Sequence, residues 1–225
     1  MLRVPVPVEL TAVVFGALSG ALHAVHRKAD VVGTFSLAMS TGVGGGILRD
    51  ILIGVSPPVA LSHALYLPVV AVAALLAMLF ARWLARLTSA LAPVDALLLG
   101  LWALIGTEQA IAHHLPITSS VFVGTVTAVG GGALRDLLTN ETPSFFLPGE
   151  LYATAAFAGA LAYPLVVQLA GLPARVGEIA TVGIACTVRL LAIHWHVRAP
   201  SPVDLPARWH DARSRLGRRS RRDPQ

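Results

Sequence analysis

The sequence is poor in charge and in cysteine. Only 13% of its 225 residues are charged, 55% are hydrophobic, and the mean hydropathy is +0.71. A water-soluble domain usually carries about 25% charged residues, because its surface must be hydrated. The shortage of charge therefore indicates that lipid contacts most of the exterior. Cys186 is the single cysteine, which excludes an intramolecular disulfide and a cysteine-based metal cluster.

The chain also lacks the short motifs that carry enzymatic or metal chemistry. It has no H-E-x-x-H spacing, no Walker-type phosphate loop and no nucleophile elbow. Residues 1–8 lack a charged region followed by a small-residue cleavage site, so we expect the first apolar segment to be retained. We expect no enzyme, no cofactor and no resident metal ion.

Long apolar runs dominate what remains. A helix needs about 20 mostly apolar residues to cross about 30 Å of hydrocarbon. Seven runs meet this need, at residues 8–25, 31–53, 64–81, 93–112, 117–138, 151–171 and 178–195. They are continuous and rich in Ala and Leu, without the period-2 alternation of a membrane barrel. The predicted fold class is an all-α membrane protein with seven transmembrane helices.

Basic residues are distributed unequally between the two sets of loops. Two of them, Arg3 and Arg175, lie on the side of the N-terminus, whereas twelve lie on the other side: Arg27, Lys28, Arg82, Arg86 and eight arginines of the tail. The positive-inside rule then predicts a multi-pass protein of the cell membrane, with the N-terminus outside and the C-terminus cytoplasmic. Because the net charge of +5 is concentrated in the tail, no nucleic-acid partner is expected for the body.

An internal repeat organises the chain. The segment VGGGILRDIL at 43–52 recurs as VGGGALRDLL at 129–138, and Glu9 and Asp95 share the same offset of 86 residues. Each unit holds three spans, an odd number, so the second unit should enter the membrane from the opposite face. The predicted organisation is two inverted three-helix repeats plus one helix, divided as 1–92, 93–173 and 174–197, with a basic cytoplasmic tail at 198–225.

The repeated glycine triplets are the first candidate functional feature: Gly44, Gly45, Gly46, Gly130, Gly131 and Gly132. Glycine costs a helix about 1 kcal/mol relative to Ala, so each triplet weakens its helix by about 3 kcal/mol. A kink or short unwound turn there would free backbone carbonyls, which in a membrane must meet water, an ion or protein. The alternative is close packing, since glycine lets membrane helices approach each other.

Each triplet is followed by two charged residues, Arg49 and Asp50 in one copy and Arg135 and Asp136 in the other. A charge at the bilayer centre costs at least ~2.5 kcal/mol, so these groups should face a cavity or a partner. Adjacent helical residues point about 100° apart. We therefore predict pairing across the repeats, Arg49 with Asp136 and Arg135 with Asp50, or pairing with helix-end carbonyls. Snorkelling to the interface is the alternative.

Further polar residues fall inside the predicted spans and are candidates for the lining of a pore: Ser40, Thr41, Thr125, Thr127 and Glu108. For the hydroxyl residues the alternative is a hydrogen bond within their own helix.

With GGGILRDILIG at 44–54 and GGGALRDLLTN at 130–140, each followed by a proline at one offset, the chain resembles the prokaryotic branch of the trimeric intracellular cation (TRIC) channels over about residues 9–195. The resemblance implies a homotrimer in which each subunit holds a pore for K⁺ and Na⁺, shaped by kinked second and fifth helices. Animal members bind phosphoinositide through a basic motif on the second span, and this chain has Gly-Gly-Gly there instead. Bacterial relatives have also been labelled glycine transporters, so a secondary transporter of a small solute stays open, as does a non-conducting scaffold.

The tail beyond residue 196 is rich in Pro and Arg, and Leu205, Trp209, Ala212 and Leu216 have the spacing of one helical face. Such a helix would lie on anionic lipid. The alternative is a disordered tail whose arginines enforce the topology.

Overall fold

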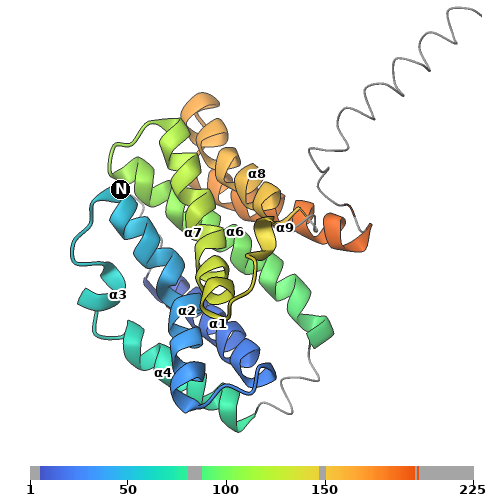
Figure 1. The fold of residues 1–225 in the computed structure, drawn as a ribbon. Coiled ribbons are helices and arrows are strands. Elements are labelled where there is room, and N and C mark those ends of the chain that lie inside the picture. Colours follow the sequence, from blue (N-terminus) through green and yellow to red (C-terminus); the bar gives the residue numbers. More distant parts are fainter. Residues whose placement is uncertain (1–5, 81–87, 147–150, 196, 198–225) are drawn as a thin grey trace, which may run out of the picture.

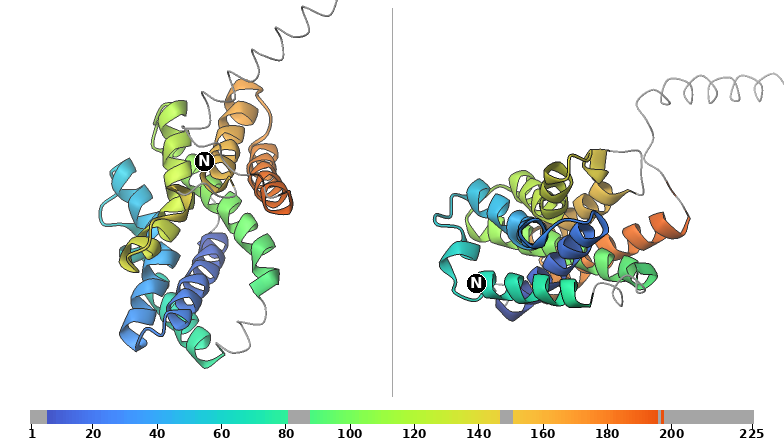
Figure 2. Two further views of the ribbon diagram at one scale, coloured as in Figure 1. Left: turned by 45° about the vertical axis from the view of Figure 1, so that its right-hand side comes forward. Right: turned by 60° about the horizontal axis from the view of Figure 1, so that its bottom comes forward.

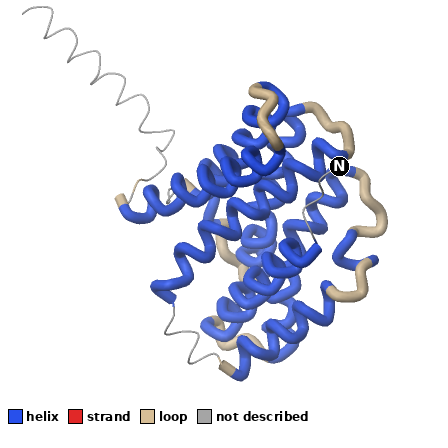
Figure 3. Tube along the Cα trace, turned by 180° about the vertical axis from the view of Figure 1, so that it is seen from behind, coloured by secondary structure: helices blue, strands red, loops and turns tan. Residues whose placement is uncertain are grey.

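The computed structural model describes residues 6–80, 88–146, 151–195 and 197. All regular secondary structure in these ranges is helical (Figure 3). The part that precedes residue 81 contains α1, α2, α3 and α4, at Val6–His26, Val31–Ile53, Val59–Ser62 and Tyr66–Leu79. The part that follows residue 87 contains α6, α7, α8 and α9, at Thr88–Ala112, Ile117–Leu138, Tyr152–Pro164 and Ala174–His194. A 3₁₀ turn at Ser144–Phe146 precedes α8, and a π-helical turn at Leu165–Leu169 extends it.

Six stretches of the described chain are long and apolar enough to cross a membrane: α1, α2, residues 93–112 of α6, α7, residues 152–169 and α9. The chain is thus a multi-pass helical membrane protein. The helix α4 is also apolar but has only 14 residues. The third predicted span, 64–81, therefore coincides with a helix shorter than a full crossing, and its predicted end lies outside the described residues, as do Arg82 and Arg86.

The boundaries of the second and fifth predicted spans, 31–53 and 117–138, are confirmed to the residue by α2 and α7. Local chemistry fixes the ends of α2. The Asp30 carboxylate accepts a hydrogen bond from the Gly33 N–H at 2.7 Å, which caps the start of the helix. Gly54, with φ of +77°, ends it in the left-handed conformation that glycine adopts without strain. The other predicted boundaries differ by a few residues; α6 begins before Pro93 and α9 begins directly after Pro173.

The helices form two groups that meet along α2 and α7 (Figures 1 and 2). In the first group α1 packs against α2 and α4, and in the second α6 packs against α7, α8 and α9. The buried core contains many alanines, among them Ala12, Ala17, Ala73 and Ala77. Small side chains let helices approach closely, which suits a membrane interior where lipid tails remove most of the hydrophobic drive between helices.

The contact between α2 and α7 is made by glycine and is reciprocal. A methyl group on Gly131 would lie 2.5 Å from the carbonyl oxygen of Thr41, and one on Gly45 would contact the carbonyl oxygen of Thr127. Gly45 and Gly131 are 86 residues apart, as are Thr41 and Thr127. Each copy of the repeated unit therefore offers the other the same surface, as in a contact with two-fold symmetry.

The predicted unwound turn at the glycine triplets is wrong, because α2 and α7 are helical without interruption through both. Four of the six glycines are closely packed against the opposite helix, as the alternative interpretation predicts. Gly44 faces the side chain of Leu134, and Gly130 faces that of Leu48, while Gly45 and Gly131 face backbone. The packing contacts offset the low helix propensity of glycine. The remaining two differ, since a methyl group would meet only open space at Gly132 and an ordinary 3.9 Å contact at Gly46.

Candidate functional site: a polar cavity between the two halves

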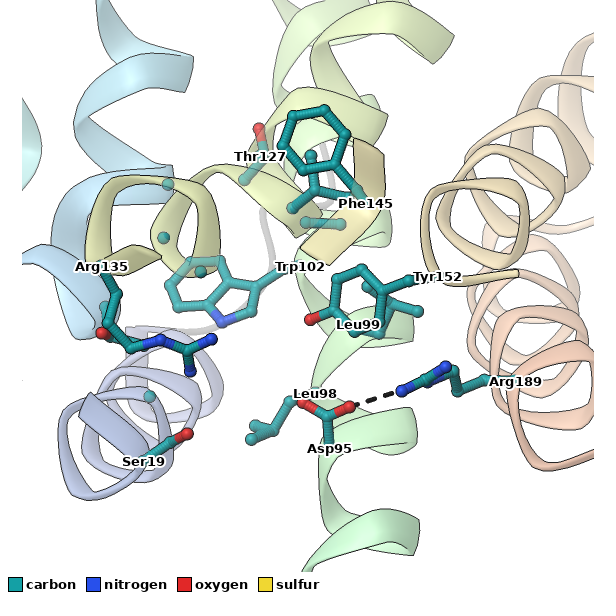
Figure 4. A pocket seen from close by; sticks show the side chains of 17 residues that line it. Ser19, Asp95, Leu98, Leu99, Trp102, Thr127, Arg135, Phe145, Tyr152 and Arg189 are labelled. Carbon is teal, nitrogen blue, oxygen red and sulfur yellow. Dashed lines mark ion pairs between the residues drawn. The ribbon is translucent and has the colours of Figure 1, made fainter. Parts of the chain in front are cut away.

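A cavity of about 520 Å³ lies where the two helix groups meet (Figure 4). Its lining comes from α1, α2, α6, α7, α8, α9 and the turn before α8, and comprises Gly16, Ser19, Thr41, Gly45, Asp95, Leu98, Leu99, Trp102, Thr127, Ala128, Val129, Gly131, Gly132, Arg135, Phe145, Tyr152 and Arg189. Three of the six predicted triplet glycines and two of the predicted polar residues, Thr41 and Thr127, are in this set. The small side chains along α2 and α7 leave the space that the cavity occupies.

Charged groups in the cavity are balanced by neighbours of opposite sign. Arg189 of α9 lies 3.8 Å from the Asp95 carboxylate of α6, and its guanidinium lies 4.8 Å from the centre of the Tyr152 ring (Figure 4). Arg135 donates from Nε and Nη2 to one oxygen of Asp136, at 2.9 Å and 2.7 Å. Guanidinium groups held in this way contribute little net positive potential to the cavity, because each has a carboxylate beside it.

Two equivalent threonines, Thr41 and Thr127, are among the residues that line the cavity. The Thr41 hydroxyl donates to the carbonyl oxygen of Leu37 at 2.8 Å, and the Thr127 hydroxyl donates to that of Val123 at 2.7 Å. A hydroxyl has one proton to donate and two lone pairs. Because the proton is used within the helix, each hydroxyl has only lone pairs left for a further partner, which suits a cation better than an anion.

A second charged cluster lies in the first half. Arg49, whose side chain is 1% exposed, donates to Glu9 of α1 at 3.0 Å and to Asp50 at 2.8 Å. The other oxygen of Asp50 accepts from the Val59 N–H at 2.7 Å, at the start of α3. A small cavity of about 10 Å³ adjoins this cluster, and its lining includes Tyr66 and Trp102. The cluster is therefore a closed and nearly dry counterpart to the open cavity.

The predicted pairing across the repeats is wrong. Each arginine contacts the aspartate that follows it in the chain, Arg49 with Asp50 and Arg135 with Asp136. The angle of 100° between adjacent Cα–Cβ vectors did not prevent this, because the long Arg side chain turns back along its own helix. The Arg49 side chain is buried within the protein, so the alternative of snorkelling to an interface does not hold for it. The Arg135 side chain is 21% exposed.

The other polar candidates lie away from the large cavity. The hydroxyls of Ser40 and Thr125 bond the carbonyl oxygens of Leu37 and Val121 in their own helices, which was the alternative interpretation. Glu108 is buried on the α6 face toward α8 and α9, near Tyr163 and Glu178. Among the described residues, no group of three or more His, Cys, Asp or Glu side chains has the placement of a metal site. The tail lies outside the described residues.

Several site residues were not predicted as such. The sequence singles out Glu9 and Asp95 only by their shared offset of 86 residues, yet both carry ion pairs. Trp102 and Tyr152 gave no signal by themselves. The 86-residue offset was the available signal for Tyr152, because it relates Tyr152 to Tyr66 of the first cluster.

Comparison with known families and proteins places the chain among membrane proteins. A family model described as "Glycine transporter" matches residues 7–82 and again 93–168, so the two copies of the repeat are matched one after the other. A UPF0126 membrane protein from Deinococcus radiodurans is 42% identical over 153 residues, covering 68% of this chain and 71% of the relative. The inner membrane protein YadS from Escherichia coli K12 is 31% identical over 186 residues, covering 82% of this chain and 89% of the relative.

Solved structures share the fold. A structure from a study of conductance through TRIC cation channels has a TM-score of 0.81 and 33% identity, with 88% of this chain and 97% of that chain covered. The TRIC orthologue from Rhodobacter sphaeroides has a TM-score of 0.79 and 30% identity, with 85% of this chain and 98% of that chain covered. These relatives are named as channels or membrane proteins, and none carries an enzyme's name.

Proposed function

Since this chain belongs to the family described as "Glycine transporter" and to the prokaryotic TRIC proteins, we propose that it is a membrane channel for monovalent cations, K⁺ and Na⁺. The observation that carries the proposal is the 520 Å³ cavity between the two halves, with hydroxyl and carboxylate oxygens in its lining. A weakly held cation needs oxygen ligands that replace part of its hydration shell and still release it. Three side chains that carry such oxygens line the cavity: Thr41, Thr127 and Asp95.

The pore lies within each subunit, and the functional assembly is a homotrimer. One chain alone provides the cavity walls, from six helices and the turn before α8, which supports one pore per subunit. The name of the Rhodobacter sphaeroides relative, a trimeric channel, supports the oligomer. A bend of α2 and α7 at the glycine triplets would widen this pore, because Gly45, Gly131 and Gly132 line it.

The two halves are inverted repeats, at 1–92 and 93–173, with the N-terminus outside and the tail in the cytoplasm. The reciprocal contact of Gly45 and Gly131 supports a two-fold relation between the halves, and three spans in each would direct that axis along the membrane plane. The basic loops and tail support the orientation, and the tail arginines would bind anionic lipid at the cytoplasmic surface.

A carrier for a small solute such as glycine is the second candidate, favoured by the description of the matching family. A coupled carrier usually needs a carboxylate that binds the driving ion. Among the carboxylates of the described spans, Asp50 and Asp136 are each bound by an adjacent arginine, and Glu108 does not line the large cavity. Asp95 does line it, but its carboxylate is paired with Arg189. This arrangement favours a channel over a carrier.

Narrowing the cavity tests the channel directly. Gly132 lines the cavity, and a Cβ atom added there meets no atom within 4 Å, so we expect Gly132→Leu to fold and to fill part of the lumen. We expect a several-fold lower unitary K⁺ conductance in planar bilayers. Gly183→Leu in α9 is the matched control, because this helical glycine also has open space beside it but lies outside the cavity lining.

Two results would contradict the proposal. Equal conductance in Gly132→Leu and Gly183→Leu would show that ions do not pass through this cavity. Saturable uptake of radiolabelled glycine into proteoliposomes, with no unitary K⁺ or Na⁺ currents from the same preparation, would establish the carrier instead.

A further inference from the structure

The large and small cavities occupy equivalent places in the two copies of the repeat. Six residues of the small cavity have their counterpart, 86 positions later, in the lining of the large one: Glu9, Val13, Val43, Gly46, Arg49 and Tyr66. The same site therefore exists twice in one chain, once with a volume of about 10 Å³ and once with about 520 Å³.

The ion pairs differ between the two sites. In the small cavity the Glu9 carboxylate reaches across from α1 to Arg49 at 3.0 Å and joins α1 to α2. Its counterpart Asp95 is one methylene shorter, and among the described residues it pairs with Arg189 of α9 rather than with Arg135. The matched family segments end at residue 168, so α9 stands outside the repeat and the first copy has no equivalent of Arg189. The bridge that closes the first site is thus missing from the second.

Trp102 is the second difference. It is 8% exposed and lines both cavities, so this residue lies between them. The counterpart of Trp102 is Gly16, which lines the large cavity and has no side chain to fill it. The small cavity is therefore bordered by the Trp102 ring, whereas the equivalent place of the large cavity has only the hydrogen atom of Gly16. This difference accounts for the smaller volume of the first cavity. Figure 4 shows Trp102 within the large cavity, with Arg135 on one side and Tyr152 on the other in this view.

We infer that the small cavity is the closed second half of the ion path, and that Trp102 together with the Glu9–Arg49 ion pair forms the gate between the halves. A space of about 10 Å³ holds roughly one water molecule, so no hydrated cation passes it. Displacement of the indole ring would join the two cavities into one polar path flanked by Thr41 and Thr127 on one side and Glu9 and Asp50 on the other. The inference rests on the proposed channel function, because it assigns the gate of that same pore.

The test compares Trp102→Ala with Trp195→Ala in the full chain, in planar bilayers. Trp195 is 64% exposed at the end of α9 and lines neither cavity, so it controls for the loss of a tryptophan. We expect a several-fold higher open probability for Trp102→Ala, a smaller increase for Trp102→Phe, and none for Trp195→Ala. Trp102→Phe keeps an aromatic ring in the core and guards against a failure of Trp102→Ala to fold.

A chemical readout that needs no ion current accompanies the recordings. In a Cys186→Ser background, Val13→Cys places a thiol in the small cavity, where Val13 is 0% exposed. We expect a membrane-impermeant methanethiosulfonate reagent to label it only when Trp102→Ala or Trp102→Phe is also present. Ser19→Cys, in the large cavity, should be labelled in every background.

Unchanged open probability and unlabelled Val13→Cys in folded Trp102 variants would overturn the inference. Absence of all cation current, with Val13→Cys still labelled only in the Trp102 variants, would refute the channel function but support the partition between the cavities. The two failures are therefore distinguishable.

Discussion

Replacing Arg49 with methionine should lower the free energy of unfolding by about 3–5 kcal/mol, because it leaves two buried carboxylates without their cation. Arg49 is 1% exposed and holds Glu9 at 3.0 Å and Asp50 at 2.8 Å. Methionine keeps most of the length and volume of the side chain but supplies no charge. The measurement is unfolding of the purified protein in mild detergent, titrated with a denaturing detergent and followed by circular dichroism.

Two other arginines provide a graded comparison. Arg27→Met removes a partner of Glu141 from an ion pair that is 51% exposed on the arginine side, and such pairs contribute about 0–1 kcal/mol. Arg135→Met should lower the free energy of unfolding by an intermediate amount. The Arg135 side chain is 21% exposed and borders the open cavity, where water can solvate the carboxylate that loses its partner. Equal losses in all three variants would show that Arg49 is not the buried cation of a closed cluster.

A double-mutant cycle then identifies the partner. The pair Glu9→Gln and Arg49→Met should show a coupling free energy well above the usual additivity error of about 0.3–0.5 kcal/mol. The pair Arg49→Met and Asp136→Asn should be additive, because the two residues belong to separate ion pairs. Coupling between Arg49 and Asp136 would restore the pairing across the repeats that the sequence suggested.

The sequence predicted the helices and the duplication well, because both are carried by local or periodic signals. The ends of α2 follow from Asp30 and Gly54, whose side-chain and backbone chemistry acts within one turn. The reciprocal contact of Gly45 and Gly131 follows the 86-residue repeat. In contrast, the length of α4 did not follow from the apolar run at 64–81, because hydropathy alone does not show which residues of a run are helical.

The ion pairs could not be predicted, since they depend on distances between helices. Glu9 lies 40 residues from Arg49 in the chain, and nothing in the spacing indicates that α1 brings it within 3.0 Å. The arginine side chain also has enough freedom to reach its own neighbour, so the 100° rule for adjacent residues excluded a contact that exists. Trp102 and Gly16 differ plainly in the aligned copies, but their effect appears only when the cavities are compared.

Adjacent glycines in one triplet should respond in opposite ways to alanine, and this is the sharpest test of how the two halves meet. A methyl group on Gly131 would lie 2.5 Å from the Thr41 carbonyl oxygen, and backbone cannot move aside as a side-chain end can. Gly131→Ala should therefore force α2 and α7 apart, at a cost of about 1–3 kcal/mol or more. Gly45→Ala should behave in the same way against Thr127.

Gly132→Ala and Gly46→Ala are the matched controls, because their added methyl groups meet open space or an ordinary contact. Alanine favours a helix over glycine by about 1 kcal/mol, so both should be neutral or slightly stabilised. Thermal unfolding of the four variants, followed by size-exclusion chromatography after heating, separates the outcomes. If the triplet is a flexible kink to which all three glycines contribute alike, alanine should change the stability equally at each position. If instead two continuous helices cross tightly, alanine should lower the stability at the middle glycine and not at the last. The difference in stability between the middle-glycine and last-glycine variants thus distinguishes a hinge from a packing contact.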